Sequence, residues 1–176
     1  MPRPSRAGFL RELETHLDGA YNFARWLTGG SDEAEDLVHD AFARALAHWK
    51  QYTPGTQMKS WLFTIVRRTF LNRLRRGKYE VTSSEYPETE DLLPAEGPGG
   101  DPMRLPPGLM RRDLDAALAT LPENQRLLVL LADLEEMSLE EIAGVLEIPV
   151  GTVKSRLWRA RQALRLKLTG YEGSLR

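Results

Sequence analysis

The chain contains no cysteine among its 176 residues, which excludes a disulfide framework and a thiolate metal site. It also lacks any apolar run near the about 20 residues needed to cross a bilayer. The amino-terminal segment MPRPSRAGFLRELETH has no apolar signal-peptide core. These absences predict a cytoplasmic protein without membrane insertion.

Recognisable catalytic motifs are missing as well. The sequence has no phosphate-binding glycine loop, no nucleophile motif and no pair of catalytic carboxylates. Glu35, Asp36, His39 and Asp40 could be read as metal ligands on one helix, but the set has a single imidazole and no second motif converges on it. A solvated helix face explains them better, so we expect no enzyme activity, no cofactor and no metal.

The net charge of −1 conceals a strong segregation of charge along the chain. Residues 1–78 carry +5, residues 79–110 carry −6, and residues 111–176 are balanced. The middle segment is rich in proline, glycine and acidic residues, which is typical of a flexible linker. The apolar residues on either side recur at helical spacing and do not alternate. We therefore predict an all-α fold: two small helical domains, 1–78 and 111–176, joined by a flexible acidic linker.

In the first domain we expect helices over 8–27, 31–49 and 59–76. The first ends at Thr28-Gly29-Gly30, where glycine can adopt the left-handed conformation, and Ser31 is expected to cap the second. An apolar stripe marks the buried face of the second helix; it comprises Ala34, Leu37, Val38, Ala41, Phe42, Ala45, Leu46 and Trp49.

The third of these helices is basic on its other faces and has aromatic neighbours. Its cations are Arg67, Arg68, Arg73, Arg75, Arg76 and Lys78. Cations interleaved with aromatic rings can hold unstacked single-stranded bases. Trp61 and Phe70 are better explained as core residues, whereas Tyr52, in a Pro-Gly loop, is the aromatic residue best placed for base contact.

The second domain is predicted to contain helices at 111–120, from Pro122 onward, at 138–146 and from 150, with core residues Leu127 through Leu131 and Leu134. Ser138 and Glu141 have the spacing of a capping box. Pro149 forces a turn before the last helix, so the closing pair has the signature of a helix-turn-helix in a four-helix unit.

The last helix has two chemically different faces. Val153, Leu157, Ala160 and Leu164 form its buried stripe, and Thr152, Ser155, Arg156 and Arg159 lie on an outward face. Between Val150 and Leu168 all six charges are positive, whereas an ordinary solvated helix would carry both signs. The pattern therefore favours binding in the major groove of duplex DNA.

Three segments together resemble a bacterial sigma factor of the extracytoplasmic-function (ECF) class. They are AEDLVHDAFARALAHW, SWLFTIVRRTFLNRLRR and LPENQRLLVLLADLEEMSLEEIAGVLEIPVGTVKSRLWRARQAL. The resemblance covers nearly the whole chain, and the order and spacing of the segments make it specific. It implies a transcription initiation factor with core RNA polymerase (beta-prime clamp and beta flap), promoter DNA and an anti-sigma factor as partners.

The resemblance also assigns site residues. Residues for the minus-thirty-five element would be Thr152, Lys154, Ser155, Arg156, Trp158 and Arg159. Residues for the minus-ten element would be Tyr52, Lys59, Arg67, Arg68, Asn72, Arg75 and Arg76. Residues for core polymerase would be Asp36, His39, Asp40 and Arg44.

The sequence departs from the family pattern at three positions. Arg68 replaces the usual asparagine and puts the minus-ten base preference in question, and His39 replaces the usual glutamine on the docking face. Glu147 stands where the helix-turn-helix usually has glycine, so either the turn avoids a positive φ or the domain tolerates the strain.

A stand-alone helix-turn-helix repressor and a sigma-like decoy are the main alternatives. Both share the DNA-binding helix pair. Neither needs a basic, aromatic-rich helix beside an acidic, clamp-like helix, and that combination favours an initiation factor.

Overall fold

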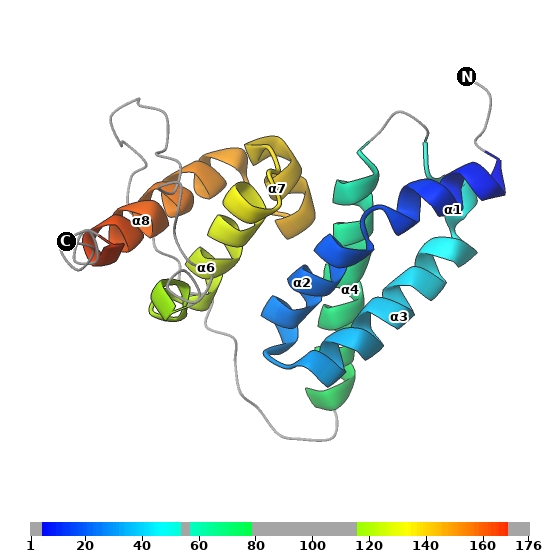
Figure 1. Cartoon of the computed structure of the whole chain (residues 1–176), viewed down its shortest axis with the longest axis horizontal. Helices are drawn as coiled ribbons and strands as arrows, with labels where there is room; N and C mark the ends of the chain where they lie inside the picture. Colours follow the sequence, from blue (N-terminus) through cyan, green and yellow to red (C-terminus); the bar gives the residue numbers. More distant parts are fainter. Residues whose placement is uncertain (1–4, 54–56, 79–115, 169–176) are drawn as a thin grey trace, which may run out of the picture. The chain divides into compact units, whose positions relative to one another are not determined.

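The computed structural model describes residues 5–53, 57–78 and 116–168, and every regular element in these ranges is a helix (Figure 1). The chain divides into two compact units. The first contains α1–α4, and the second contains α6, η2, α8 and most of α7. The predicted all-α, two-domain architecture is confirmed, while the predicted linker 79–110 lies outside the described residues.

The first unit is a bundle around α4. Its elements are α1 (Arg6–Glu14), α2 (Leu17–Thr28), α3 (Ser31–Ala47), the 3-10 turn η1 (Trp49–Gln51) and α4 (Met58–Lys78). Helix α4 packs against α1, α2 and α3, and α2 also packs against α3. At the centre, Phe23 of α2 and Phe63 of α4 stack with ring centroids 4.9 Å apart and planes 5° from parallel. These contacts hold α3 and α4, the two helices with predicted binding faces, in a fixed relation.

The predicted single helix over 8–27 is wrong: the segment forms two helices, α1 and α2. The first ends at Glu14 and is capped by Thr15, whose hydroxyl donates to the Glu12 carbonyl at 2.7 Å; the His16 N–H donates to the Leu13 carbonyl at 3.1 Å. The break lets the apolar faces of both short helices turn toward the core. The predicted end of α2 is confirmed, since Gly29 closes it in the left-handed conformation with φ 74°.

Helix α3 differs from its prediction at both ends. Gly30 is the residue before the helix, and Ser31 is its first helical residue and makes no capping hydrogen bond to the backbone. At the other end α3 stops at Ala47, so Trp49 belongs to η1. The predicted stripe is nonetheless the inward face: Ala34, Leu37, Val38, Ala41 and Ala45 are buried, and the remaining members, Phe42, Leu46 and Trp49, are half-buried.

The second unit contains a helical segment at 116–119, followed by α6 (Glu123–Val129), the π-helical turn η2 (Leu130–Leu134), α7 (Leu139–Leu146) and α8 (Val150–Leu168). Pro122 precedes α6; of the predicted core residues 127–131, residues 128–131 are buried and Leu127 is half-buried. Leu134 was predicted to be core but is 45% exposed. The π turn holds one residue more than an α turn, and this extra residue moves Leu134 off the core stripe.

Arg126 of α6 hydrogen-bonds the end of the helical segment that precedes α6. Its guanidinium donates to the carbonyls of Leu118, Ala119 and Leu121 at 2.9–3.1 Å. The Leu118 and Ala119 carbonyls belong to the last turn of the 116–119 segment, where acceptors outnumber the backbone donors available to them, and Leu121 follows it. The Arg126 side chain therefore links the 116–119 segment to α6, which in turn packs against α8.

Candidate nucleic-acid interface

Helix α7 has the capping box that the sequence predicted. The Ser138 hydroxyl accepts from the Glu141 N–H at 3.2 Å, and the Glu141 carboxylate accepts from the Ser138 N–H at 2.7 Å. This reciprocal pair fixes the first residue of the helix. The start of the first helix of the helix-turn-helix is therefore set by local contacts.

The turn between α7 and α8 adopts the left-handed geometry in spite of its glutamate. Glu147 has φ 57° and ψ 42°, and its N–H bonds the Ala143 carbonyl. Pro149 then starts α8 by accepting from the Thr152 and Val153 N–H groups at 3.0 and 3.1 Å. Of the two possibilities that the sequence left open, the turn keeps the strained conformation.

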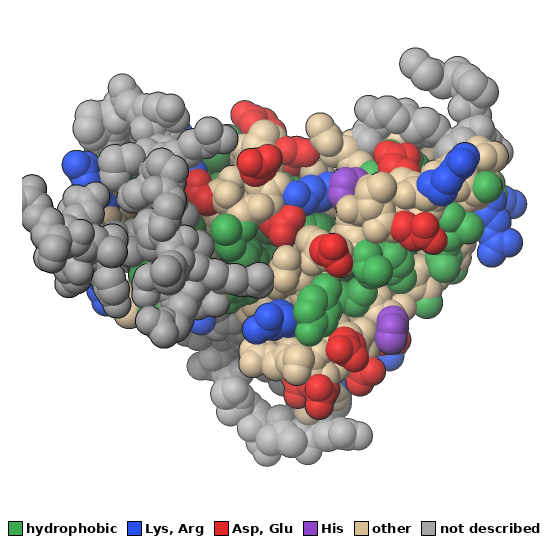
Figure 2. Space-filling model, in the orientation of Figure 1, with side chains coloured by type: hydrophobic (Ala, Val, Ile, Leu, Met, Phe, Trp, Pro, Cys, Tyr) green, Lys and Arg blue, Asp and Glu red, His purple; other side chains and the backbone are tan. Residues whose placement is uncertain are grey.

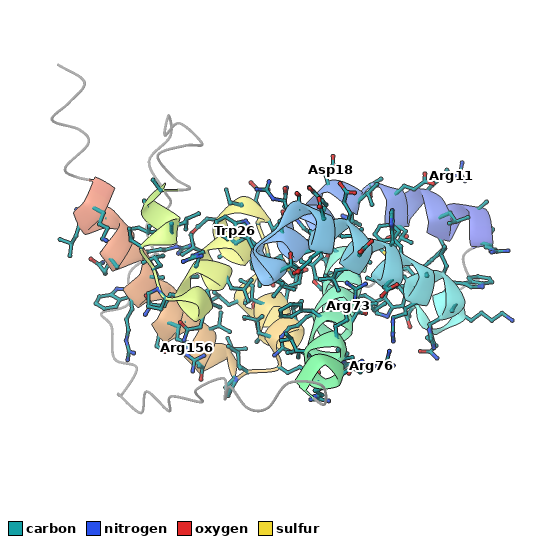
Figure 3. The ribbon with its side chains drawn as sticks, turned by 90° about the horizontal axis from the view of Figure 1, so that it is seen from below. Arg11, Asp18, Trp26, Arg73, Arg76 and Arg156 are labelled. Carbon is teal, nitrogen blue, oxygen red and sulfur yellow. The ribbon has the colours of Figure 1, made fainter. Side chains whose placement is uncertain are left out.

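The two faces of α8 are those predicted from the sequence. Val153, Leu157, Ala160 and Leu164 are at most 1% exposed. The predicted minus-thirty-five residues lie outside this stripe: Lys154 and Trp158 are exposed, and Thr152, Ser155, Arg156 and Arg159 are half-buried. Arg156 is labelled on α8 in Figure 3. The outward face thus combines cations with short polar side chains, the chemistry that suits phosphates and base edges.

One of the six cations of α8 points inward. Arg161 forms a two-armed ion pair with Asp133 of η2, with Nε–Oδ2 at 3.1 Å and Nη2–Oδ1 at 2.5 Å. Both side chains are nearly buried, with exposed fractions of 11% and 6%. Sequence analysis did not single out this pair, because its members are 28 residues apart. Its position assigns it to bracing α8 rather than to the outward face.

Helix α4 presents most of its predicted minus-ten residues at the surface. Arg68, Asn72, Arg75 and Arg76 are exposed, while Lys59 and Arg67 are half-buried. The Lys59 Nζ lies 5.8 Å from the centroid of the Phe63 ring, within cation–π range. The buried face of the same helix carries Leu62, Phe63 and Val66. The structure thus brings the predicted cations together on one helix.

The prediction that Tyr52 is held out for base contact does not agree with the structure. Its side chain is 4% exposed, its hydroxyl donates to Glu12 Oε1 at 2.9 Å, and its ring lies 5.7 Å from Phe9 and 5.5 Å from Trp61. A Pro-Gly loop follows Tyr52 in sequence, but α1 folds back over the ring. Tyr52 therefore anchors the chain just before that loop to α1 and α4.

The exposed face of α3 carries all four predicted core-polymerase residues: Asp36, His39, Asp40 and Arg44. Figure 2 shows acidic side chains gathered at the lower end of the first unit, where α3 begins. An exposed acidic face of this kind is suited to a basic protein surface.

Sequence analysis missed a contact that joins α3 to α4. Arg73 of α4 bonds Asp40 Oδ2 through Nη2 at 2.5 Å and through Nε at 3.2 Å, and its Nη2 also donates to the Asp36 carbonyl at 2.8 Å. The hydrogen bond from Arg73 lowers the pKa of Asp40 below its ordinary value, and the positive charges of Arg44 and Arg76 act in the same direction. The Arg73 guanidinium therefore favours the ionised form of Asp40. In Figure 3, Arg73 and Arg76 are labelled on α4.

Within the described ranges, no group of three or more His, Asp or Glu side chains gathers where a metal ion could be held. None of the helices described is long and apolar enough to cross a membrane. The arrangement instead offers two cationic helix faces and one acidic one.

Comparison with known proteins connects these faces with one family. The Sigma-70 region 2 model matches residues 13–79, and the Sigma-70 region 4 model matches residues 111–164. The ECF RNA polymerase sigma factor EcfG of Rhodopseudomonas palustris is 36% identical over 142 residues, which span 81% of this chain and 75% of that protein. SigE of Mycolicibacterium smegmatis, another ECF sigma factor, is 38% identical over 153 residues. These residues span 87% of this chain but only 58% of the length of SigE.

A solved structure agrees with these matches. The sigma factor RpoE of Bartonella quintana, in complex with the anti-sigma factor NepR, has a TM-score of 0.68 and 32% sequence identity, covering 92% of this chain and 96% of that one. The chain therefore belongs to the ECF RNA polymerase sigma factors of the sigma-70 family.

Proposed function

We propose that this chain is a transcription initiation factor that binds core RNA polymerase and directs it to specific promoters. The observation that carries the proposal is the pairing of two faces in the first unit: the exposed acidic residues of α3 and the exposed cations of α4. A DNA-binding protein that works alone needs no such acidic face. The second unit adds a helix-turn-helix, so one chain carries the surfaces for a protein partner and for two stretches of DNA.

In this proposal α8 binds the duplex of the minus-thirty-five element in the major groove. Lys154 and Arg159 would neutralise phosphates, and Thr152, Ser155, Arg156 and Trp158 would lie along the base edges. The left-handed turn at Glu147 leads into α8, and the nearly buried ion pair between Arg161 and Asp133 holds this helix to η2. A rigidly held helix favours specific readout because its side chains reach the groove without further ordering.

Helix α4 binds the minus-ten element in the same proposal, with single-stranded bases as its targets. The contributing residues would be Lys59, Arg67, Arg68, Asn72, Arg75 and Arg76. An arginine at position 68 can stack on a base or hydrogen-bond to its edge. Tyr52 serves here as the anchor of the loop before α4, because its ring is buried and its hydroxyl is bonded to Glu12.

Asp36, His39, Asp40 and Arg44 of α3 would dock on the beta-prime clamp of core polymerase, and the second unit would meet the beta flap. The chain would work in the cytoplasm, where the polymerase and the chromosome are. The related Bartonella protein was solved with an anti-sigma factor. We extend that type of partner to this chain as its regulator.

Run-off transcription with purified core polymerase tests the central proposal. The chain should co-elute with core and yield promoter-specific transcripts that core alone does not produce. Duplex binding without co-elution, and without any promoter-specific transcript, would instead support a stand-alone helix-turn-helix repressor or a sigma-like decoy.

A further inference from the structure

The contact between Arg73 and Asp40 joins the two binding faces of the first unit. Asp40 belongs to the exposed face of α3, and Arg73 to the helix that carries the proposed minus-ten residues. The pair could not be predicted from local spacing, because Arg73 and Asp40 are 33 residues apart in the sequence. The ion pair links α3 with α4, so a role in either binding event bears on both.

The geometry of the pair is one-sided. Both donating nitrogens of Arg73 reach the same carboxylate oxygen, Oδ2, and no hydrogen bond to Oδ1 is found among the described residues. The side chain of Asp40 is 54% exposed. One oxygen is therefore occupied within the domain, and the carboxylate keeps room to accept from a group outside it.

The position of the guanidinium is itself fixed. Nη2 donates to the Asp36 main-chain carbonyl as well as to Asp40, so Arg73 is held against the backbone of α3 and in turn holds the Asp40 side chain. A carboxylate held in one orientation loses less side-chain entropy when it meets a partner.

We propose that Arg73 is a positioning residue for polymerase docking: it orients Asp40 so that the second carboxylate oxygen can accept from a guanidinium or ammonium group of core RNA polymerase. This inference rests on the proposed docking through α3. Arg73 makes no contact with polymerase in it and acts through Asp40.

The test measures the affinity of the full-length chain for core polymerase by fluorescence titration. Asp40→Asn should weaken binding about tenfold, because a charge-assisted hydrogen bond is lost. Arg73→Gln should weaken it about fivefold while the Asp40 charge remains. The double variant should bind no more weakly than Asp40→Asn alone, since Arg73 then has no carboxylate to orient.

Arg11→Gln is the matched control, because it removes the same charge from an exposed arginine on α1 of the same unit. Its affinity for core should equal that of the unaltered chain. Arg73→Lys is the second variant: a lysine restores a cation but has no second arm for the Asp36 carbonyl, so it should recover part of the affinity lost in Arg73→Gln. All titrations are made at a temperature where circular dichroism shows full helicity.

The outcomes separate the inference from the function on which it rests. If Asp40→Asn binds core normally, docking through this residue of α3 is wrong, and the inference falls with it. If Asp40→Asn binds weakly but Arg73→Gln binds normally or more tightly, Arg73 does not position Asp40, and the inference alone is overturned. Additive losses in the double variant would overturn it too, because they would mean that the two residues act separately.

Discussion

Glu147 occupies a backbone conformation that favours glycine. Its φ of 57° lies in the left-handed region, at the end of α7. An L-residue there costs about 1 kcal/mol relative to glycine. Glu147→Gly should therefore unfold at a higher urea concentration than Glu147→Ala, with a free energy of unfolding larger by about 1 kcal/mol. The alanine variant also lacks the glutamate side chain, so the comparison isolates the backbone; equal stabilities would show that the turn carries no strain.

Asp40 should show the effect of its arginine partner in a pH titration. The hydrogen bond from Arg73 lowers the pKa of Asp40, as do the charges of Arg44 and Arg76. Because the folded-state pKa is the lower one, the pair contributes to stability above the ordinary aspartate pKa, and this contribution disappears as the pH falls through the lowered value. The carboxyl carbon of Asp40, followed by NMR, should titrate at a higher pH in Arg73→Gln than in the unaltered chain. An unchanged midpoint would contradict the ion pair.

At the level of single residues, the sequence identifies which side chains are charged but not which of them are paired. The family resemblance picked out Asp36, His39, Asp40 and Arg44, and all four are exposed on α3. Arg73 and Arg161 look like two more surface cations, and each finds its carboxylate on a helix far away along the chain. Tyr52 was misjudged for a similar reason, since its burial depends on α1 folding over it.

Among the helices, α8 depends on one nearly buried ion pair for its support. Arg161→Met should reduce the free energy of unfolding by about 3–5 kcal/mol, because Asp133 would be left buried without its cation. The matched control is Arg165→Met, an exposed position on the same helix, which should change stability by no more than about 0.5 kcal/mol. Urea unfolding followed by circular dichroism gives both values. Similar losses in the two variants would contradict the bracing role of Arg161.

The helices differ in how well their patterns predicted them. Helix α8 and the capping box of α7 follow from local spacing alone, so both are confirmed. The break at Thr15 and His16 carries no proline or glycine, and the chain bends there because both halves bury apolar faces against one core. The π turn η2 likewise leaves no mark in the sequence, which is why Leu134 was misplaced.

For the molecule as a whole, the two helices proposed to bind DNA, α4 and α8, belong to different compact units. Each proposed DNA contact can therefore be altered without disturbing the other core. Residues in different units that share no partner are expected to have additive effects on binding free energy. If α8 binds the minus-thirty-five element and α4 binds the minus-ten element, substitutions in the two helices should therefore have additive effects.

Lys154→Ala and Arg68→Asn, separately and together, test this property. Lys154→Ala should weaken binding to the minus-thirty-five duplex and reduce the salt-dependence slope by about 0.9 for one lost phosphate contact. Arg68→Asn should change which minus-ten bases support run-off transcription while leaving duplex affinity unchanged. The double variant should combine both effects, with binding free energies additive within about 0.5 kcal/mol. If Arg68→Asn shows the same minus-ten base preference as the unaltered chain, Arg68 does not contact those bases. If the salt slope of Lys154→Ala is unchanged, Lys154 does not contact a phosphate.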